Sequence, residues 1–211
     1  MFYSGPTADG VYITKATYSL VAPKTPTGAA TSGGNEELAF WIGIQNSPNG
    51  GDVLNENFVQ PLLNWAPSQK DTGCDATEKQ WCITTSTYTP QGQLPAGYKP
   101  LDPGASVDFE IVVDGSVTQT VYVDGEVYQQ QTDSEGMKPG VFYGSNECYL
   151  QNCGSLDAYS YTDIVVELSE ADPNFGDTLS LTGATSDGFT TSDGGKTWKN
   201  AKITINKDTL A

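Results

Sequence analysis

Ser106-Val-Asp-Phe-Glu-Ile-Val-Val113 decides the fold class of this chain, together with the two segments that follow it at 117–123 and 126–131. The first segment begins with strict alternation of polar and apolar residues, as in a strand with one buried face. The two later segments flank Asp124-Gly125, a dipeptide typical of a two-residue hairpin turn. This stretch therefore predicts antiparallel strands joined by tight turns.

Strand signals recur outward from this stretch in both directions, and helical signals are nearly absent. Residues 38–44 form a continuous apolar run, which is typical of a strand buried on both faces. Long turn-rich segments at 23–35 and 91–103 predict surface loops. The pattern predicts an all-β, single-domain antiparallel β-sandwich or jelly roll over residues 1–211. Further strands are expected at 11–21, 58–65, 81–88, 159–168, 178–181, 188–192 and 198–205.

The composition removes several kinds of chemistry. The 211 residues include ten lysines but no arginine and no histidine, and the formal net charge is −16. Histidine-dependent triads and histidine-ligated metals are therefore excluded. The missing basic patch argues against nucleic acid, membrane and anionic substrates as partners. No cofactor and no metal is expected, and we expect a monomer.

Four cysteines, Cys74, Cys82, Cys148 and Cys153, indicate the redox environment. Three pairings are possible, and the two short spacings favour Cys74–Cys82 and Cys148–Cys153. A cysteine-ligated metal is the alternative, although the spacings are not those of zinc sites. Disulfides predict a secreted, extracellular protein. The absence of a leader-like segment after Met1 is interpreted as the start of a mature chain.

Other motifs allow a structural or a functional interpretation. The stretch from Thr191 to Trp198 fits an Asp-box pattern, which we interpret as a structural hairpin turn. Residues 172–177 offer oxygen ligands for Ca²⁺ without matching an EF-hand, and a solvated loop is the favoured interpretation. Glu36, Glu37 and Asp187 are expected to be surface charges. Tryptophans and tyrosines could line a sugar-binding face. Among the tryptophans Trp41, Trp65 and Trp81, we expect Trp65 and Trp81 to be the leading platforms, because each lies at a strand end beside a loop.

Residues 12–23 and Phe40-Trp-Ile-Gly-Ile44 are two of several strand segments that follow one another in an informative order. In this order they resemble strands of the eqolisins, the fungal glutamic peptidases with a concanavalin-like β-sandwich: residues 12–23 resemble the opening strand of the family, and residues 40–44 resemble its A-W-V-G-I. Residues 59–65, Val-Gln-Pro-Leu-Leu-Asn-Trp, lie where the family has L-Q-T-G-V. Residues 101–111 and 153–168 are similar to two later strands of the family. The resemblance implies a concanavalin-like jelly roll.

The resemblance also implies two candidate catalytic residues, Gln60 and Asp163. Gln60 matches the glutamine of the family, and its amide would stabilise an oxyanion. Asp163 takes the position of the family glutamate in Tyr-Thr-Asp-Ile-Val-Val-Glu, and its carboxyl group would activate water. Here the sequence departs from the family, because the N-A-E context is missing. Residues 81–86 also lack the glutamate of the family's W-Y-E-W strand.

Two functional hypotheses follow, and the sequence leaves both open. In the first, the protein binds, or processes, a neutral extracellular glycan. In the second, it is an acid-active hydrolase of glutamic-peptidase type that uses Gln60 and a carboxylate on a polypeptide substrate. A non-catalytic cell-wall or effector role is a further alternative.

Overall fold

A computed structural model of the 211-residue chain describes residues 1–29, 37–46, 55–149 and 152–210. Almost all regular structure in the described part is β-strand, with short 3-10 helices at Gln69–Thr72 and Phe175–Thr178. The strands are β1 (Phe2–Ser4), β2 (Ile13–Val21), β3 (Glu37–Asn46), β4 (Phe58–Val59), β5 (Leu62–Trp65), β6 (Trp81–Thr84), β7 (Ser86–Thr89), β8 (Gly92–Pro95), β9 (Lys99–Leu101), β10 (Ser106–Asp114), β11 (Ser116–Val123), β12 (Glu126–Asp133), β13 (Pro139–Tyr149), β14 (Gly154–Leu156), β15 (Tyr159–Leu168), β16 (Ser180–Leu181), β17 (Ala184–Ser186), β18 (Thr197–Ile205) and β19 (Asp208–Leu210).

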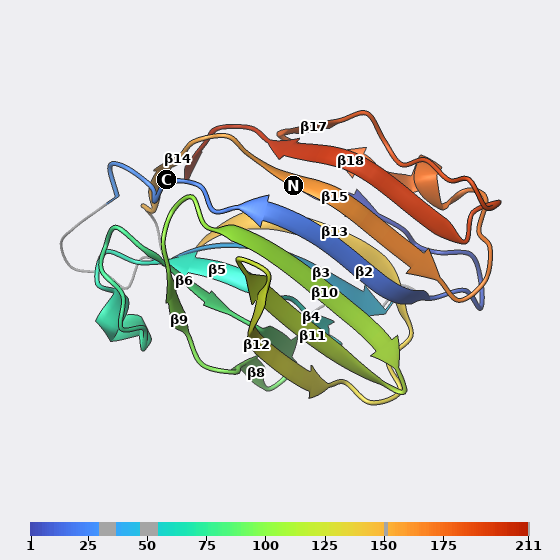
Figure 1. Ribbon diagram of the computed structural model, residues 1–211, viewed down its shortest axis with the longest axis horizontal. Helices are drawn as coiled ribbons and strands as arrows, with labels where there is room; N and C mark the ends of the chain where they lie inside the picture. The colour runs from blue at the N-terminus through green and yellow to red at the C-terminus, as the bar shows by residue number, and fades with distance from the viewer. Residues whose placement is uncertain (30–36, 47–54, 150–151, 211) are drawn as a thin grey trace.

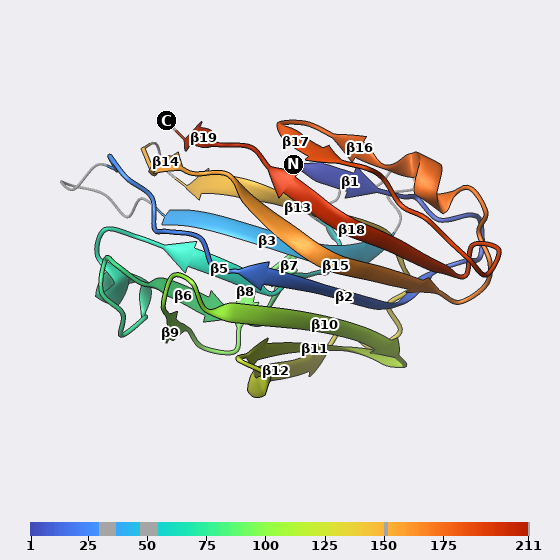
Figure 2. The ribbon, with the colours of Figure 1, turned by 45° about the horizontal axis from the view of Figure 1, so that its top comes forward.

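Two antiparallel sheets pack face to face, which confirms the predicted β-sandwich. The seven-stranded sheet has the order β12-β11-β10-β2-β15-β18-β17. It lies in front in Figure 1, and Figure 2 shows the same strands stacked from β18 down to β12. The ten-stranded sheet lies behind it and follows the order β16-β1-β13-β3-β4-β7-β8, with β5, β6 and β9 attached beside β3. A small third sheet pairs β14 with β19.

The hairpin that decided the fold class is present as predicted. Val123 pairs with Glu126 across the turn at Asp124 and Gly125, and both turn residues have positive φ, at 51° and 82°. A two-residue hairpin turn of type I′ requires positive φ at both central positions. Residues 106–113 lie within β10, which pairs with β11 on one side and β2 on the other.

The core lies between the two sheets and is rich in aromatic rings. Tyr18 stacks on Phe109 with ring centroids 4.7 Å apart, and it meets Tyr161 edge-on at 5.8 Å. From the opposite sheet Phe142 contacts the same ring at 6.2 Å. The Tyr18 hydroxyl donates to the carbonyl oxygen of Ile42 at 3.0 Å, so the buried phenol is satisfied.

A polar seam joins the sheets at the β7–β11 edge. Gln119 is 1% exposed and extends from β11 to the backbone of β7. Its Oε1 accepts from the Ser86 backbone N–H at 3.0 Å, and its Nε2 donates to the Ser86 carbonyl oxygen at 2.9 Å. The same Ser86 carbonyl accepts the backbone N–H of Gln60 at 2.9 Å. The seam thus fixes the backbone next to a predicted site residue.

The structure differs from the sequence-based expectation mainly at β13. This strand was not predicted, because Gly140, Gly144 and Asn146 lower its strand signal. It forms because β3 and β1 pair with it on both sides. The expected loop at 91–103 contains two edge strands, β8 and β9. At 188–192 only an isolated bridge from Thr190 to Lys199 is present.

Both disulfides form as predicted. Cys74 bonds to Cys82 and Cys148 bonds to Cys153, across sequence separations of 8 and 5. No cysteine is left free. In the described part of the chain, no helix is long and apolar enough to cross a membrane.

Candidate functional site

Gln60 and Asp163, the two candidate catalytic residues, lie in different sheets. Gln60 follows β4 in the ten-stranded sheet and is 7% exposed. Asp163 lies in β15 of the seven-stranded sheet, where its backbone has a φ of 53° and the pairing with β2 shifts register. The exposed Asp163 carboxyl group therefore does not share a sheet with the Gln60 amide. The shared face that the dyad requires is not formed by these two residues.

Trp65 and Trp81 point into the core, so neither ring is available as an exposed platform. Their exposed fractions are 5% and 0%. The indole N–H of Trp65 donates to the Glu78 carbonyl at 2.8 Å, and that of Trp81 donates to the Pro23 carbonyl at 2.7 Å. Their place at strand ends suggested exposure, but the register puts both rings in the inward-facing row of the sheet.

The outer face of the ten-stranded sheet carries a different aromatic cluster. It consists of Trp41, Phe58, Tyr143 and Tyr3, whose side chains point away from the core. Trp41 meets Phe58 and Tyr143 edge-on at 5.1 and 5.6 Å. Phe58 stacks on Tyr143 at 4.6 Å, and it can do so because Gly43 beneath it has no side chain. The sequence named Trp41 as one aromatic candidate but favoured Trp65 and Trp81 over it.

Two carboxyl groups lie beside this aromatic cluster on the same face. Glu147 Oε2 accepts from the indole N–H of Trp41 at 3.3 Å. Glu37 Oε1 accepts a hydrogen bond from the amide of Asn64, which also contacts the Tyr98 hydroxyl at 3.3 Å. Burial raises the pKa of Glu37, and the nearby charge of Glu147 raises it further.

Glu37 is thus half-buried and hydrogen-bonded, which corrects the expectation of a surface charge. Its environment also acts on Tyr98, whose pKa is raised to about 12 by burial and by the charge of Glu37. The alternation along β3 contains a signal that could have identified Glu37. Residues 37 and 41 are four apart in one strand, so their side chains share a face.

Two buried amide oxygens on this face have no hydrogen-bond partner among the described residues. They are Gln60 Oε1 and Asn64 Oδ1. The Gln60 amide nitrogen makes one long contact, at 3.5 Å to Gln93 Oε1. Leaving a buried acceptor unpaired costs about 1–3 kcal/mol, so such groups usually have a water or a functional reason.

The acidic side chains of two other motifs accept hydrogen bonds from the backbone. Asp193 of the Asp-box accepts from the backbone N–H groups of Thr197 and Lys196, at 2.9 and 3.1 Å, and these bonds, that from Thr197 above all, lower its pKa. Asp172 accepts from the backbone N–H of Ala8 at 2.8 Å and of Asn174 at 3.1 Å. Within the described residues, no group of three potential ligands is placed to hold a metal ion.

No protein-family model and no curated protein sequence matches the chain significantly. Solved structures do match its fold. Scytalido-glutamic peptidase with a peptide-based transition state analogue is 13% identical over 94% of this chain and 97% of that chain, with a TM-score of 0.54. The same enzyme with another transition state analogue inhibitor is 14% identical over the same shares, also at 0.54. A Bacillus licheniformis β-glucanase is 12% identical over 99% of this chain and 78% of that one, at 0.35. At these identities, the likeness to the peptidase shows a concanavalin-like fold and nothing finer.

Proposed function

We propose that the protein is secreted and binds a neutral glycan on the outer face of its ten-stranded sheet, with Trp41 as the ring on which a sugar stacks. The observation that carries this proposal is that Trp41 is only half-buried on this outer face. The chain has four tryptophans, and the other three, Trp65, Trp81 and Trp198, are buried. The two disulfides support an oxidising compartment.

The groups around Trp41 suit a neutral sugar. Its ring is held in place by Phe58, Tyr143 and the hydrogen bond to Glu147. Aromatic faces pack well on the C–H surface of a sugar. Carboxylates such as Glu147 and Glu37 accept hydrogen bonds from hydroxyl groups and repel anionic sugars. The proposal keeps the predicted ligand class and moves the platform from Trp65 and Trp81 to Trp41.

Fluorescence titration with neutral oligosaccharides, such as cello- and laminari-oligosaccharides, tests this proposal. The buried tryptophans should respond little, so a ligand-dependent change reports on Trp41. Trp41→Ala should weaken binding by about 1–2 kcal/mol, or roughly 5- to 30-fold, and Trp41→Phe by less. Tyr12→Ala, which removes a ring that contacts Lys138 elsewhere, is the control and should bind normally. An unchanged affinity in Trp41→Ala, or no binding across the panel, refutes the proposal.

Acid-active hydrolysis is the second candidate, and the raised pKa of Glu37 favours it. A carboxyl group that keeps its proton at higher pH can act as a general acid. Glu37 shares its sheet with Gln60, whereas Asp163 does not. Cleavage of an unfolded polypeptide at about pH 3–5 that is lost in Glu37→Gln and Gln60→Ala, but kept in Asp163→Asn, would support this function. Full retention of cleavage in Glu37→Gln would exclude Glu37 from it.

A further inference from the structure

A groove of about 490 Å³ opens on the other sheet, along β2, β10 and β15. Small-molecule sites usually have volumes of about 300–1,000 Å³. Three of its polar side chains stand in one row, because Asp108 pairs with Ser19 and Ser19 pairs with Thr162 across neighbouring strands. In these strands the flanking Leu20, Val107 and Tyr161 side chains are buried. The row therefore lies on the outer face of the seven-stranded sheet.

Only some of the polar groups that line the groove make hydrogen bonds to other residues of the protein. The Ser19 hydroxyl donates to Asp108 Oδ1 at 2.6 Å, and Ser160 exchanges a hydrogen bond with Thr204 at 2.9 Å. In the described part of the chain, Asp108 Oδ2 and the Thr162 hydroxyl have no hydrogen-bond partner. The groove thus offers an acceptor held in place by Ser19, together with a hydroxyl that can donate or accept.

A β-bulge lies at the edge of the groove. The pairing of β15 with β2 shifts between Thr162 and Val165, and the bulged residue Asp163 has a φ of 53°. Positive φ is uncommon outside glycine, and bulges are frequent beside functional sites. Asp163, which the resemblance implied as a catalytic residue, is thus the bulged residue of β15.

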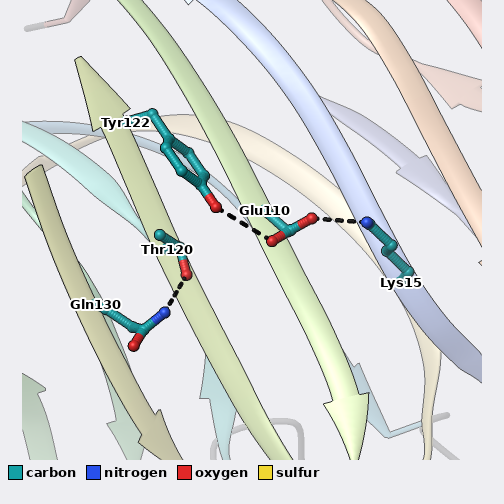
Figure 3. A network of polar contacts seen from close by, with 5 residues as sticks. All are labelled: Lys15, Glu110, Thr120, Tyr122 and Gln130. Atoms are coloured by element: carbon teal, nitrogen blue, oxygen red, sulfur yellow. Dashed lines mark hydrogen bonds and ion pairs between the residues drawn. The ribbon is translucent and has the colours of Figure 1, made fainter. Parts of the chain in front are cut away.

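Next to the groove, one ion pair and two hydrogen bonds join polar side chains on the same face of the sheet (Figure 3). Glu110 accepts from Lys15 at 2.6 Å and from the Tyr122 hydroxyl at 3.4 Å. On the neighbouring strands, Gln130 donates to the Thr120 hydroxyl oxygen at 2.9 Å. Tyr122 is also the cross-strand partner of Asp108, so its oriented ring borders the polar row.

From these observations we propose that the groove binds one or two units of a neutral, polyhydroxylated ligand such as a sugar. Asp108 disfavours an anion, and the exposed Lys202, paired in register with Thr162, disfavours a cation. The row of Ser19, Asp108 and Thr162 disfavours a purely apolar ligand, because its polar groups would be left unpaired. The exposed Val21 and its neighbours supply aliphatic surface for sugar C–H groups. This inference does not rest on the proposed function, since the groove lies on the opposite sheet.

Chemical-shift mapping on the ¹⁵N-labelled protein tests the groove, with glucose, galactose, mannose, cellobiose and laminaribiose as probes. At least one probe should shift the backbone amides of Ser19, Asp108 and Thr162. Asp108→Ala should weaken this binding by about 10- to 100-fold, the effect of losing a hydrogen bond to a charged group. Asp114→Ala, which removes an exposed carboxyl group at the other end of β10, is the matched control and should leave the affinity unchanged.

Two further variants keep the result interpretable. Thr162→Val preserves the shape of the side chain and should also weaken binding, even if Asp108→Ala perturbs folding. Trp41→Ala should retain the groove shifts, so that failure of the proposed function and failure of this inference remain distinct. Absence of groove shifts with every probe, shifts confined to the Trp41 region, or unchanged affinity in both groove variants would overturn the inference.

Discussion

Replacing Gln119 by leucine should loosen the seam between the two sheets. Gln119 is 1% exposed and makes three hydrogen bonds to β7, two with the Ser86 backbone and one with the Thr87 hydroxyl at 3.2 Å. Leucine has a similar size but no polar group, so it removes all three bonds without leaving a large cavity. The change therefore isolates the polar contribution of the seam.

The three lost bonds have unequal consequences. The Ser86 carbonyl keeps the Gln60 backbone N–H, and the Thr87 hydroxyl keeps Asp133. The Ser86 backbone N–H loses the acceptor that the Gln119 side chain provides. A buried donor left unpaired costs about 1–3 kcal/mol, and the two other bonds add a smaller loss. We therefore expect Gln119→Leu to lower the free energy of unfolding by about 2–3 kcal/mol, a large share of the 5–15 kcal/mol of a typical protein.

Urea unfolding at pH 7, followed by tryptophan fluorescence, measures this loss. The midpoint should fall while the slope m stays unchanged, because the surface exposed on unfolding is similar. Gln130→Leu on the neighbouring strand is the matched control. It removes one bond to Thr120 from an exposed side chain, so it should cost less than about 1 kcal/mol. If Gln119→Leu is as stable as the wild type, the polar seam does not hold the sheets together in the way described.

Two further predictions concern a charge and a crosslink. Burial and Glu147 raise the pKa of Glu37, so the stability it contributes is present below the unfolded pKa of about 4.3 and is lost as pH rises through the folded pKa. Glu37→Gln should therefore melt at a higher temperature than the wild type at pH 7 and gain nothing at pH 4; a gain of equal size at both values would contradict this reasoning. Removing Cys148–Cys153 with paired alanines should cost about 2–3 kcal/mol in the chain-entropy picture, measured by denaturant unfolding, and an unchanged stability would show that the bridge is dispensable.

Local sequence determined many of the strands and both disulfides of this protein. Alternation and turn chemistry act between near neighbours, so β10, β11, β12 and the turn at Asp124 could be predicted from residues 106–131 alone. The close spacing of the cysteines likewise allowed both disulfide pairings to be predicted, because short loops favour local pairing. Where a strand owes its existence to its neighbours, as β13 does, the local signal was too weak to reveal it.

Only the tertiary structure decided which residues meet. A period of two tells which side chains share a face of a strand, but it does not tell which face is buried or which sheet the strand joins. Trp65 and Trp81 therefore turned inward while Trp41 on the outer face stayed half-buried, and Gln60 and Asp163 were assigned to different sheets. The pairing of distant strands set these outcomes, because it brings together segments that have no local contact in the sequence.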